Sequence, residues 1–585
     1  MKSFQIYFFG LVPWSIGSIL DHFKYYGRND SKKINIPRGI RDMRFVVVTG
    51  GVISGIGKGT ITSSLAYILR ERNYKVDIVK IDPYINYDAG TMNPYQHGEV
   101  FVLSDGTETD LDLGNYERFL SRDLKSGNNL TTGKIYKWVI EKERRGDFLG
   151  STVQIIPHVT DEIKRRIRSI GLEDNSDIVL IEVGGVVGDI ESMPFLEALR
   201  QMRLEEDGKI FFIHVTYVPT LRSVGEPKTK PTQHSVKELR SIGIQPDAII
   251  ARSETELDRD LKEKIALFTQ VDERAVISIP DVGDIFTMPL LLNDTVLPNY
   301  MLEKMGLKPN ESNMEFWRGI VENIKKPSHY VTIGVVGKYV QIKDSYISNE
   351  HSFMHVTGKT GIGVKLKWIN SEKEEHIEEM LNDVDGVLIP WGYGPRGTEG
   401  KIRAIRYARE NKVPLLGICF GFQLTVVEFA RNVLGLEGAN SSELNPDTKY
   451  PVIDLLPEQV GLTDKGGTMR LGDTKVVIKK GTKAYELYGE EVVYERHRHR
   501  YEVNPKYIES IEKNGMLFSA TDESGTRMEI LELEGHPFFM GSQFHAEFKS
   551  RPEKPSILHE ALVLAASRYN NIRRKKFIEQ EKFAK

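Results

Sequence analysis

The stretch Arg44-Phe-Val-Val-Val-Thr49-Gly-Gly-Val52-Ile-Ser-Gly-Ile-Gly-Lys58-Gly-Thr60 decides the fold class of the first half of the chain. Its valine-rich start predicts a strand buried on both faces, and residues 61–70 predict a helix. Glycines between a strand and a helix let backbone N–H groups turn toward an anion, which the helix dipole also favours. Lys58 adds a positive charge and Thr60 a hydroxyl. We predict a phosphate-binding loop, although Val52 stands where the common P-loop has glycine; a tight turn without a ligand is the alternative.

Short apolar runs alternate with helical stretches on both sides of the polar region near residue 320. In the first half the expected strands are residues 45–49, 76–81, 178–183, 210–215 and 248–251. In the second half they are residues 331–337, 364–369, 386–390, 413–418 and 538–544. This alternation predicts an α/β fold with two doubly wound parallel-sheet domains. The expected boundaries are residues 1–42 for an extension, 43–305 for the first domain, 306–330 for a linker, 331–570 for the second domain and 571–585 for a basic tail.

The N-terminal extension needs its own interpretation. Residues 4–20 carry no charge and follow Lys2, which is weakly typical of a signal-peptide core or a membrane anchor. Gly10, Pro13 and Gly17 interrupt that run and count against a spanning helix. We expect an appendage outside the fold, or sequence upstream of a true start at Met43.

The composition is that of an ordinary globular protein. Of 585 residues, 40% are hydrophobic and 28% are charged, and the formal net charge is -3, so nothing global favours a nucleic-acid or membrane-surface partner. A chain of this length exceeds one hydrophobic core. A single cysteine excludes an internal disulfide and a cysteine-rich zinc site, which fits a reducing, cytoplasmic location.

Acidic residues follow the first-half strands where an α/β sheet places ligands. Lys80-Ile-Asp-Pro-Tyr ends the second strand, Glu108-Thr-Asp110-Leu-Asp112 lies in a loop, and Glu182 ends a buried strand. A buried carboxylate is costly without a cation, and Mg²⁺ prefers carboxylates together with substrate phosphates. With Lys58 nearby, Asp110 and Glu182 predict an ATP–Mg²⁺ site; singly, each could be a salt-bridged structural acid.

A basic loop provides a further signal. Lys228-Thr-Lys230-Pro-Thr-Gln233-His234 places two lysines and several hydrogen-bonding side chains before a helix. This composition suits a second phosphate-bearing substrate. A solvated basic loop is the alternative.

The only cysteine carries the most specific motif of the chain. In Leu415-Leu-Gly417-Ile-Cys419-Phe-Gly421-Phe-Gln423 an apolar strand runs into a cysteine flanked by glycines, and a helix follows. This order is typical of a nucleophile elbow, where a sharp turn exposes the sulfur near backbone N–H groups. His545 and Glu547, two apart at an expected strand end, can face the same way as base and orienting group. A buried structural cysteine and a satisfied histidine are the alternatives.

These motifs resemble known enzymes. Gly-Ile-Cys-x-Gly-x-Gln with a distant Phe-His-x-Glu-Phe resembles triad (class I) glutamine amidotransferases. The first half is similar to the CTP synthase family through Gly-Gly-Val-Ile-Ser, Lys-Ile-Asp-Pro-Tyr-Ile-Asn, Glu-Thr-Asp-Leu-Asp-Leu-Gly and Lys-Thr-Lys-Pro-Thr-Gln-His. Gly466-Gly-Thr-Met-Arg-Leu-Gly472 and Glu495-Arg-His-Arg-His-Arg-Tyr501 extend the likeness over nearly all of residues 43–570.

The resemblance implies a set of site residues. ATP would contact Gly55, Ile56, Gly57, Lys58, Gly59, Thr60, Lys80, Asp110, Asp281 and Val282, with Mg²⁺ on Asp110 and Glu182. UTP, or the product CTP as feedback inhibitor, would contact Ser54, Asp189, Ile190, Glu191, Lys228, Thr229, Lys230, Pro231, Thr232, Gln233 and Lys264. Glutamine would contact Gly392, Phe420, Gly421, Phe422, Gln423, Glu443 and Arg500, and the catalytic residues would be Cys419, His545 and Glu547.

The resemblance also implies a reaction. ATP would phosphorylate the uracil 4-oxygen of UTP, Cys419 would release ammonia from glutamine, and ammonia passing between the halves would displace the phosphate to give CTP. GTP would act as allosteric activator, with a contact near residues 396–400, and the assembly would be a homotetramer.

Three segments depart from the family pattern. Pro390-Trp391-Gly392-Tyr393-Gly394 replaces Pro-Gly-Gly-Phe-Gly near the glutamine site, and tryptophan lacks the conformational freedom of glycine, which leaves an intact, slowed or altered glutaminase open. Residues 348–356 have poor apolar spacing, so we expect an atypical first helix in the second domain. Ala546 replaces proline inside the Phe-His-x-Glu motif, which we expect to be tolerated.

Two other classes of protein remain as alternatives. A P-loop switch or partitioning-type ATPase with a hydrolase domain would hydrolyse ATP without UTP, but it leaves the Lys228–Gln233 loop unexplained. A non-catalytic filament or scaffold protein would keep the fold without the chemistry, against which the intact triad counts.

Overall fold

The structure is a computed structural model that describes residues 43–93, 97–221, 225–341, 343–456, 459 and 466–584. The chain divides into two units, residues 1–43 and 44–585. The expected extension, residues 1–42 with their weak signal-peptide or anchor pattern, lies outside the described residues. Within the described residues, no helix combines the length and the apolar character needed to cross a bilayer.

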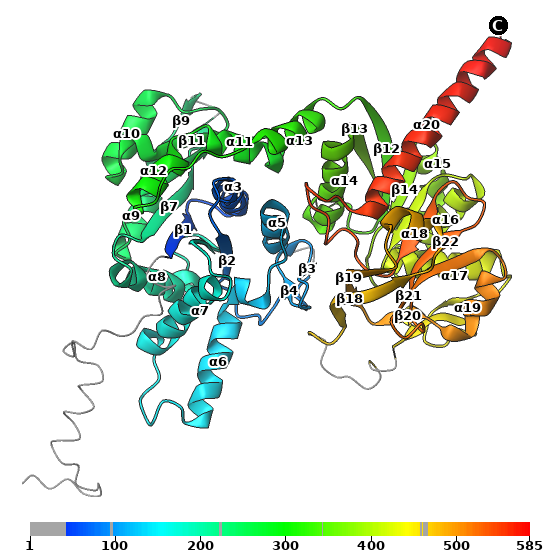
Figure 1. Cartoon of the computed structure of the whole chain (residues 1–585), viewed down its shortest axis with the longest axis horizontal. Coiled ribbons are helices and arrows are strands. Elements are labelled where there is room, and N and C mark those ends of the chain that lie inside the picture. Colours follow the sequence, from blue (N-terminus) through cyan, green and yellow to red (C-terminus); the bar gives the residue numbers. More distant parts are fainter. Residues whose placement is uncertain are drawn as a thin grey trace, which may run out of the picture. The chain divides into compact units, whose positions relative to one another are not determined.

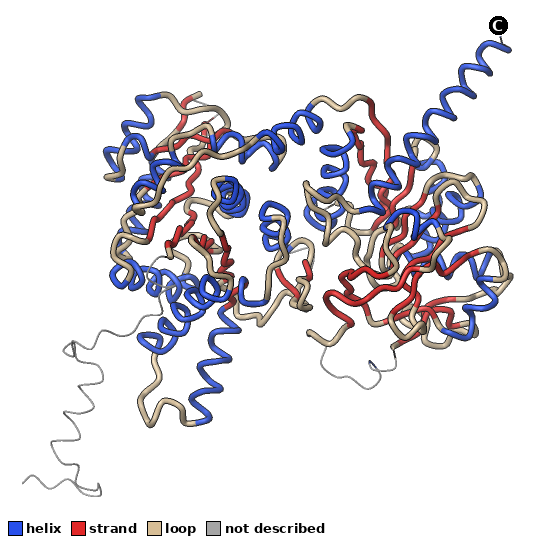
Figure 2. The backbone as a smooth tube through the Cα atoms, in the orientation of Figure 1, coloured by secondary structure: helices blue, strands red, loops and turns tan. Residues whose placement is uncertain are grey.

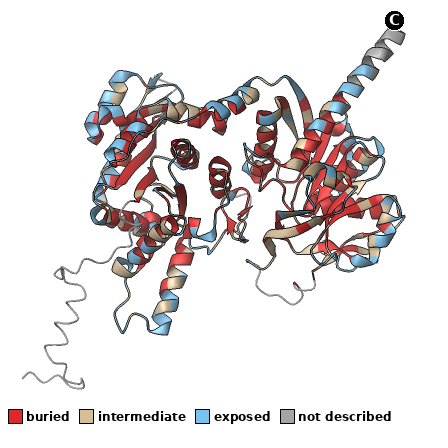
Figure 3. Cartoon of the chain, in the orientation of Figure 1, coloured by how far each residue is buried: buried red, intermediate tan, exposed pale blue. Residues whose placement is uncertain are grey.

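The first half is built on a seven-stranded sheet whose described pairings are all parallel. Its strand order is β11 (Val276–Pro280), β10 (Ala248–Ser253), β7 (Ile210–Tyr217), β1 (Arg44–Gly50), β6 (Ile178–Val183), β2 (Val76–Asp82) and β5 (Asn129–Thr131). All five expected strands are confirmed, whereas β5 and β11 were not anticipated. β1, β2 and β6 are buried almost throughout (red in Figure 3), because helices cover both faces.

Helices follow the strands as in other doubly wound sheets (Figure 1). They are α3 (Lys58–Glu71), α5 (Leu111–Leu120), α6 (Thr132–Arg145), α7 (Thr160–Glu173), α8 (Met193–Glu205), α9 (Lys230–Ser241), α10 (Arg259–Thr269), α11 (Met288–Asn293) and α12 (Leu297–Lys304). Two further pairs of short strands are antiparallel: β3 (Phe101–Val102) with β4 (Glu108–Thr109), and β8 (Thr220–Leu221) with β9 (Glu226–Pro227).

The segment expected to be a linker contains helix α13 (Glu315–Lys325). Its Trp317 is buried, packs against Tyr67 with ring centroids 4.2 Å apart, and donates from Nε1 to the carbonyl oxygen of Phe286 at 2.6 Å. Trp317, Ile320 and Val321 are buried on one side of this helix, an apolar spacing typical of an amphipathic helix that the interpretation as a polar linker overlooked.

The second half contains a nine-stranded sheet, drawn with the first in Figure 2. Five strands are parallel: β13 (Ile362–Asn370), β12 (His329–Gly337), β14 (Gly386–Ile389), β15 (Leu415–Ile418) and β23 (Phe539–Ser542). They match the five expected strands. Four antiparallel strands extend the sheet: β22 (Met528–Leu533), β21 (Met516–Asp522), β18 (Arg470–Ile478) and β19 (Val492–His499). This extension was not predicted.

The remaining elements of the second half surround this sheet. They are α15 (Ile377–Leu381), α16 (Thr398–Glu410), α17 (Phe420–Asn432), α18 (Lys483–Tyr488), α19 (Pro505–Glu512) and a small sheet of β16 (Asn440–Ser441), β17 (Pro451–Leu455) and β20 (Tyr501–Val503). Helix α20 (Ile557–Ala584, red in Figure 1) runs through the residues expected to form a basic tail.

Helix α14 (Ile347–Thr360) forms where the apolar spacing was poor. It is buried around most of its circumference, so a one-sided apolar stripe is not required. Its buried histidines find polar partners: His351 Nδ1 lies 3.2 Å from Nη1 of Arg118, and His355 Nδ1 lies 2.9 Å from Oγ of Ser550. The helix is thus atypical in composition but regular in structure.

Candidate active sites

The glycine loop after β1 turns sharply before α3. Gly55 (φ 73°) and Gly57 (φ 86°) take left-handed conformations, and so does Val52 (φ 81°), the residue at the usual glycine position. A β-branched residue with positive φ is a strained outlier, and such outliers gather at functional sites. The missing glycine therefore does not change the turn, because Val52 accepts the conformation that glycine would supply.

Two lysines lie under this loop. Lys58 Nζ donates to the carbonyl oxygen of Gly185 at 2.8 Å, and burial lowers its pKa. Lys80 Nζ lies 2.9 Å from Oε1 of Glu182 and also contacts Asp112. Burial opposes the charge of Lys80, but the carboxylates of Asp112 and Glu182 outweigh it and hold its pKa well above the usual value.

A cavity of about 1030 Å³ opens between the loop and these acids. Its lining includes the predicted residues Ser54, Gly55, Ile56, Gly57, Lys58, Gly59, Thr60, Lys80, Asp110, Glu182, Asp189 and Glu191. Other lining residues were not among the predicted site residues, including the polar side chains of Asp82, Tyr84, His97, Asp112, Asn115 and Asp344. Asp112 and Asp82 stood inside quoted motifs, whereas Asp344 comes from the second half of the chain.

The carboxylates of this cavity fit a cation in the presence of phosphate. Burial, Asp112 and Asp82 raise the pKa of Asp110 to about 8. A cation bound nearby would therefore stabilise the ionised form of this carboxyl group. Within the described residues, no three His, Cys, Asp or Glu side chains are arranged to hold a metal ion on their own. A pair of carboxylates with phosphate oxygens and water is, however, the usual way in which proteins bind Mg²⁺.

Some predicted nucleotide residues lie outside the lining of this cavity. Thr229 and Thr232 are buried at the start of α9, where Thr232 Oγ1 lies 2.9 Å from Oγ1 of Thr216. Lys228 pairs with Glu226 at 3.0 Å, while Lys230 and Lys264 are exposed. The residues that the cavity lining does not include are Ile190, Lys228, Thr229, Lys230, Pro231, Thr232, Gln233, Lys264, Asp281 and Val282.

Cys419 forms a strained turn between β15 and α17. Its φ of 55° and ψ of -103° are unusual for a residue with a side chain, and its N–H donates to the carbonyl oxygen of Ser542 at 2.7 Å. A Cβ on Gly421 would lie 2.0 Å from the carbonyl oxygen of Ile389, and one on Gly417 would lie 2.8 Å from that of Gly421. Both glycines are therefore required by close backbone approach, as expected of a nucleophile elbow.

The expected base and its orienting acid are joined. His545 Nδ1 and Glu547 Oε1 are 2.8 Å apart, and the imidazole stacks on Phe548 with centroids 4.7 Å apart. Burial opposes the charge of His545, but the charges of Glu547 and Cys419 raise its pKa to about 10. Its Nε2 is buried and, among the described residues, lacks a hydrogen-bond partner of normal geometry. The imidazole is thus oriented by Glu547 and coupled to Cys419.

Trp391 does not need the freedom of glycine. Gly392 (φ 141°) and Gly394 (φ 88°) take the positive φ values of this loop, and Trp391 is not among the described non-glycine residues that do. Its side chain is buried beside Tyr346 and Tyr339, with ring centroids 5.3 Å and 5.9 Å away. The tryptophan is therefore accommodated as a packing residue.

The remaining predicted glutamine residues lie around the elbow. Phe420, Gly421, Phe422 and Gln423 form the first turn of α17, and Gln423 Nε2 donates to the carbonyl oxygen of Tyr501 at 2.7 Å. Arg500 contacts Oε1 of Gln459 at 2.5 Å and Oγ1 of Thr468 at 2.9 Å. Burial raises the pKa of Glu443.

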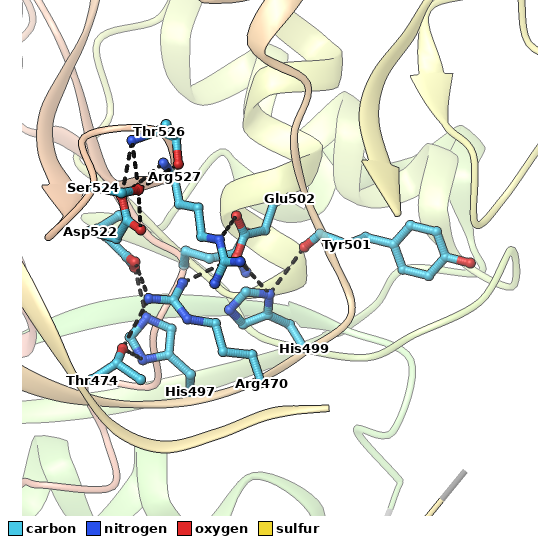
Figure 4. A network of polar contacts seen from close by, with 12 residues as sticks. Arg470, Thr474, His497, His499, Tyr501, Glu502, Asp522, Ser524, Thr526 and Arg527 are labelled. Atoms are coloured by element: carbon cyan, nitrogen blue, oxygen red, sulfur yellow. Dashed lines mark hydrogen bonds and ion pairs between the residues drawn. The ribbon is translucent and has the colours of Figure 1, made fainter. Parts of the chain in front are cut away.

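The side chains of β19 point alternately to the two faces of the strand, with the histidines on one face and the arginines on the other. His497 Nε2 contacts Oε2 of Glu529 at 2.7 Å inside a network in which Arg470 pairs with Glu529 at 2.7 Å and Glu502 at 3.1 Å. Figure 4 shows His497 and His499 in this network, with Asp522 and Arg527 nearby. Burial opposes the Glu529 charge, but His497 and Arg470 lower the pKa of this carboxyl below its usual value.

The arginines of β19 contact the first half of the chain. Arg496 is fully buried and lies 2.8 Å from both Glu117 and Asp123, and Arg498 Nε lies 2.8 Å from Oε1 of Glu108. Because successive side chains of a strand point to opposite faces, one strand serves both an internal network and a contact with the first half. Sequence reasoning noted this motif but not its two faces.

Comparison with known proteins identifies a family model for each half of the chain. Residues 44–307 match the family model "CTP synthase N-terminus", and residues 341–565 match "Glutamine amidotransferase class-I". The chain is 59% identical over 529 residues to a CTP synthase of Pyrococcus abyssi, covering 90% of this chain and 98% of the relative. A CTP synthase of Archaeoglobus fulgidus is 56% identical over 528 residues, covering 90% of this chain and 99% of the relative.

Proposed function

The chain belongs to the CTP synthase family, and we propose that its cavity residues and its Cys419–His545–Glu547 triad carry out the two half-reactions of that family. The protein is an enzyme that converts UTP to CTP with nitrogen from glutamine, using ATP. The observation that carries the residue assignment is the combination, in one chain, of a glycine-loop cavity lined by lysines and carboxylates and of a histidine that is hydrogen-bonded to Glu547 and interacts electrostatically with Cys419.

In the first half, the glycine loop and Lys58 bind the ATP phosphates, and Lys80 neutralises charge on the transferred group. Phosphorylation of the uracil 4-oxygen turns a poor leaving group into a good one. Asp110 and Glu182, together with Asp112, which contacts Lys80 as Glu182 does, would hold Mg²⁺, and the bound ion would neutralise charge on phosphate oxygens. This assignment adds Asp112 to the pair predicted from the sequence.

UTP binds to residues at two places. Ser54, Asp189 and Glu191 line the cavity, and the basic segment from Lys228 to Gln233 with Lys264 supplies positive charge for a triphosphate. CTP competes there as feedback inhibitor. The enzyme is a homotetramer in this proposal; Ile190, Leu149 and Ile156 are 85%, 88% and 51% exposed and are candidates for burial between subunits.

In the second half, Cys419 attacks the glutamine amide carbon as a thiolate while its proton is held on His545, whose raised pKa favours the charged imidazolium. A C–S bond forms, the C–N bond breaks, and ammonia leaves with the proton from His545. The first amides of α17 have no acceptor within the helix and face the developing oxyanion. Water then hydrolyses the thioester to glutamate. We place the activating GTP near Arg396 and Glu399, and the enzyme in the cytoplasm.

One assay tests this proposal. CTP formation is measured with UTP, ATP and Mg²⁺, comparing glutamine with free ammonia. We expect the wild type to use both, and Cys419→Ala to use ammonia only. Failure with ammonia would contradict the synthetase assignment, and loss of both activities in Cys419→Ala would contradict separate sites. ATP hydrolysis that needs no UTP would favour the switch-type ATPase.

A further inference from the structure

The nucleophile has a neighbour that the family pattern does not supply. Tyr393 stands where the family motif has phenylalanine, so its hydroxyl is an additional polar group in the glutaminase site. Its Oη lies 3.6 Å from Sγ of Cys419. The same hydroxyl donates to the carbonyl oxygen of Arg498, and Sγ of Cys419 lies 3.7 Å from that oxygen. Hydroxyl, sulfur and carbonyl thus form a small triangle.

The loop holds this tyrosine in place. The carbonyl oxygen of Tyr393 accepts from Nζ of Lys338, and its ring lies 6.3 Å from that of Phe420 in the first turn of α17. Gly392 and Gly394 on either side take positive φ. Burial and the neighbouring Cys419 raise the pKa of the Tyr393 phenol, so the group keeps its proton. The protonated phenol can therefore act as a hydrogen-bond donor.

We propose that Tyr393 is a catalytic residue of the glutaminase, whose hydroxyl donates a hydrogen bond to the Cys419 thiolate. This inference rests on the proposed role of Cys419 as nucleophile. When Cys419 carries its proton, the S–H group and the phenol O–H group both donate to the carbonyl oxygen of Arg498. When the S–H proton passes to His545, the sulfur becomes the stronger acceptor, and the phenol O–H turns from the carbonyl to the sulfur. Tyr393 neither gains nor loses a proton in this step.

The surroundings make such a donor necessary. Cys419 is fully buried, and a buried anion is costly unless hydrogen bonds compensate it. Gln543 Nε2, another donor near the sulfur, is farther away at 3.9 Å. Its Oε1 accepts from Gln423 Nε2 at 3.2 Å, which fixes the orientation of the amide. The phenol is closer and has a rotating O–H, so it follows the change of charge on the sulfur.

The single cysteine makes the test direct. Iodoacetamide alkylation of the full-length enzyme, followed by mass spectrometry across a pH series, reports on Cys419 alone. For Tyr393→Phe we expect alkylation at neutral pH to be about tenfold slower, because the thiolate loses a hydrogen-bond donor and a smaller fraction of Cys419 is ionised. Glutaminase kcat should fall by a similar factor with little change in the KM for glutamine. Ammonia-dependent CTP synthesis should stay unchanged, which also shows that the variant is folded.

A matched control removes a hydroxyl that contacts the same loop from another segment of the chain. Tyr346 Oη donates to the carbonyl oxygen of Trp391 at 3.3 Å, so Tyr346→Phe should keep the wild-type alkylation profile. An unchanged profile in Tyr393→Phe would overturn the proposal. So would faster alkylation and faster glutamine hydrolysis, because the hydroxyl would then obstruct the thiolate. Failure of the nucleophile assignment is distinct, since Cys419→Ala would then keep glutamine-dependent synthesis.

Discussion

Glu108 and Arg498 form a buried ion pair, with 2.8 Å between Oε1 and Nε, and the carbonyl oxygen of the same arginine lies 3.7 Å from Sγ of Cys419. Glu108 belongs to the hairpin that leads into Asp110 and Asp112 of the nucleotide cavity. Arg498 therefore contacts the hairpin of the nucleotide cavity through its side chain and the nucleophile Cys419 through its backbone carbonyl. Direct contact of this kind is a physical route between the two sites.

Breaking this pair should be costly. We expect Glu108→Gln to reduce the free energy of unfolding by about 3 kcal/mol, because it leaves a buried arginine without its counter-charge. Adding Arg498→Met should recover part of the loss. Urea unfolding measures both, with Glu509→Gln in the exposed pair with Lys513 as control, expected to change stability by less than about 0.5 kcal/mol. Simple additivity of the two changes would contradict the coupling.

The elbow should not tolerate a methyl group. In Gly421→Ala the new Cβ would lie 2.0 Å from the carbonyl oxygen of Ile389, so the turn that carries Cys419 must shift. We expect glutamine-dependent synthesis to fall at least about 100-fold, since a displacement of about 1 Å costs that much. Ammonia-dependent synthesis is measured alongside. Gly319→Ala in α13, where a Cβ meets nothing within 4 Å, should be neutral or stabilising.

The triad should make stability depend on pH. The folded-state pKa of His545, about 10, lies above the reference value of 6.5, so the pair with Glu547 stabilises the fold fully below about pH 6.5. This contribution is lost as the pH rises through about 10. The difference in urea midpoint between wild type and Glu547→Gln should therefore shrink between these values. A difference in midpoint that stays constant with pH would disprove this contribution of the His545–Glu547 pair. Glu379→Gln, beside the exposed His376, serves as control.

Restoring the family glycine at Trp391 should harm the protein. Trp391→Gly empties a buried site beside Tyr346 and Tyr339, and we expect a loss of at least about 3 kcal/mol in unfolding free energy. Trp391→Phe should lose less, partly because it removes an indole Nε1 that is buried without a partner among the described residues. Urea unfolding and glutaminase assays measure the outcome. A more stable and more active glycine variant would contradict the packing role.

A negative charge at the exposed apolar residue Ile190 should disturb assembly. We expect Ile190→Asp to shift the enzyme from tetramers to smaller species and to raise the KM for UTP, because Ile190 stands between the predicted UTP residues Asp189 and Glu191. Analytical ultracentrifugation measures the assembly. Ile572→Asp, a change at another exposed isoleucine in α20, should leave it intact. Equal effects of both changes would argue against a specific interface.

Patterns local in sequence predicted much of this structure. The strand–glycine–helix order before Lys58 and the two-residue spacing of His545 and Glu547 each determine geometry over short distances, and both were confirmed. The antiparallel extension was missed because β18 and β19 carry charged side chains on both faces, which conceals the usual apolar alternation. Helix α14 was expected to be atypical because its sequence lacks a one-sided apolar stripe. A helix that is buried on most sides does not need such a stripe.

Contacts between distant segments could not be predicted. Asp344 and Glu182 line one cavity although they come from different halves of the chain. No pattern within a short stretch of sequence predicts that these two residues lie close together. The left-handed Val52 is a similar case, since its backbone conformation follows from the surrounding turn and not from its own preference. The hydroxyl of Tyr393 was visible in the sequence, but only the fold places it beside Cys419.

The alternation along β19 restricts how this enzyme can change over evolutionary time. A single substitution at Arg496 or His497 alters one side of the strand and leaves the other intact. Inserting or deleting one residue would exchange the sides, so that imidazoles would face Glu108 and Glu117 while guanidinium groups faced Glu529. Point mutations can therefore explore either surface gradually, whereas a shift in length would be lost at once.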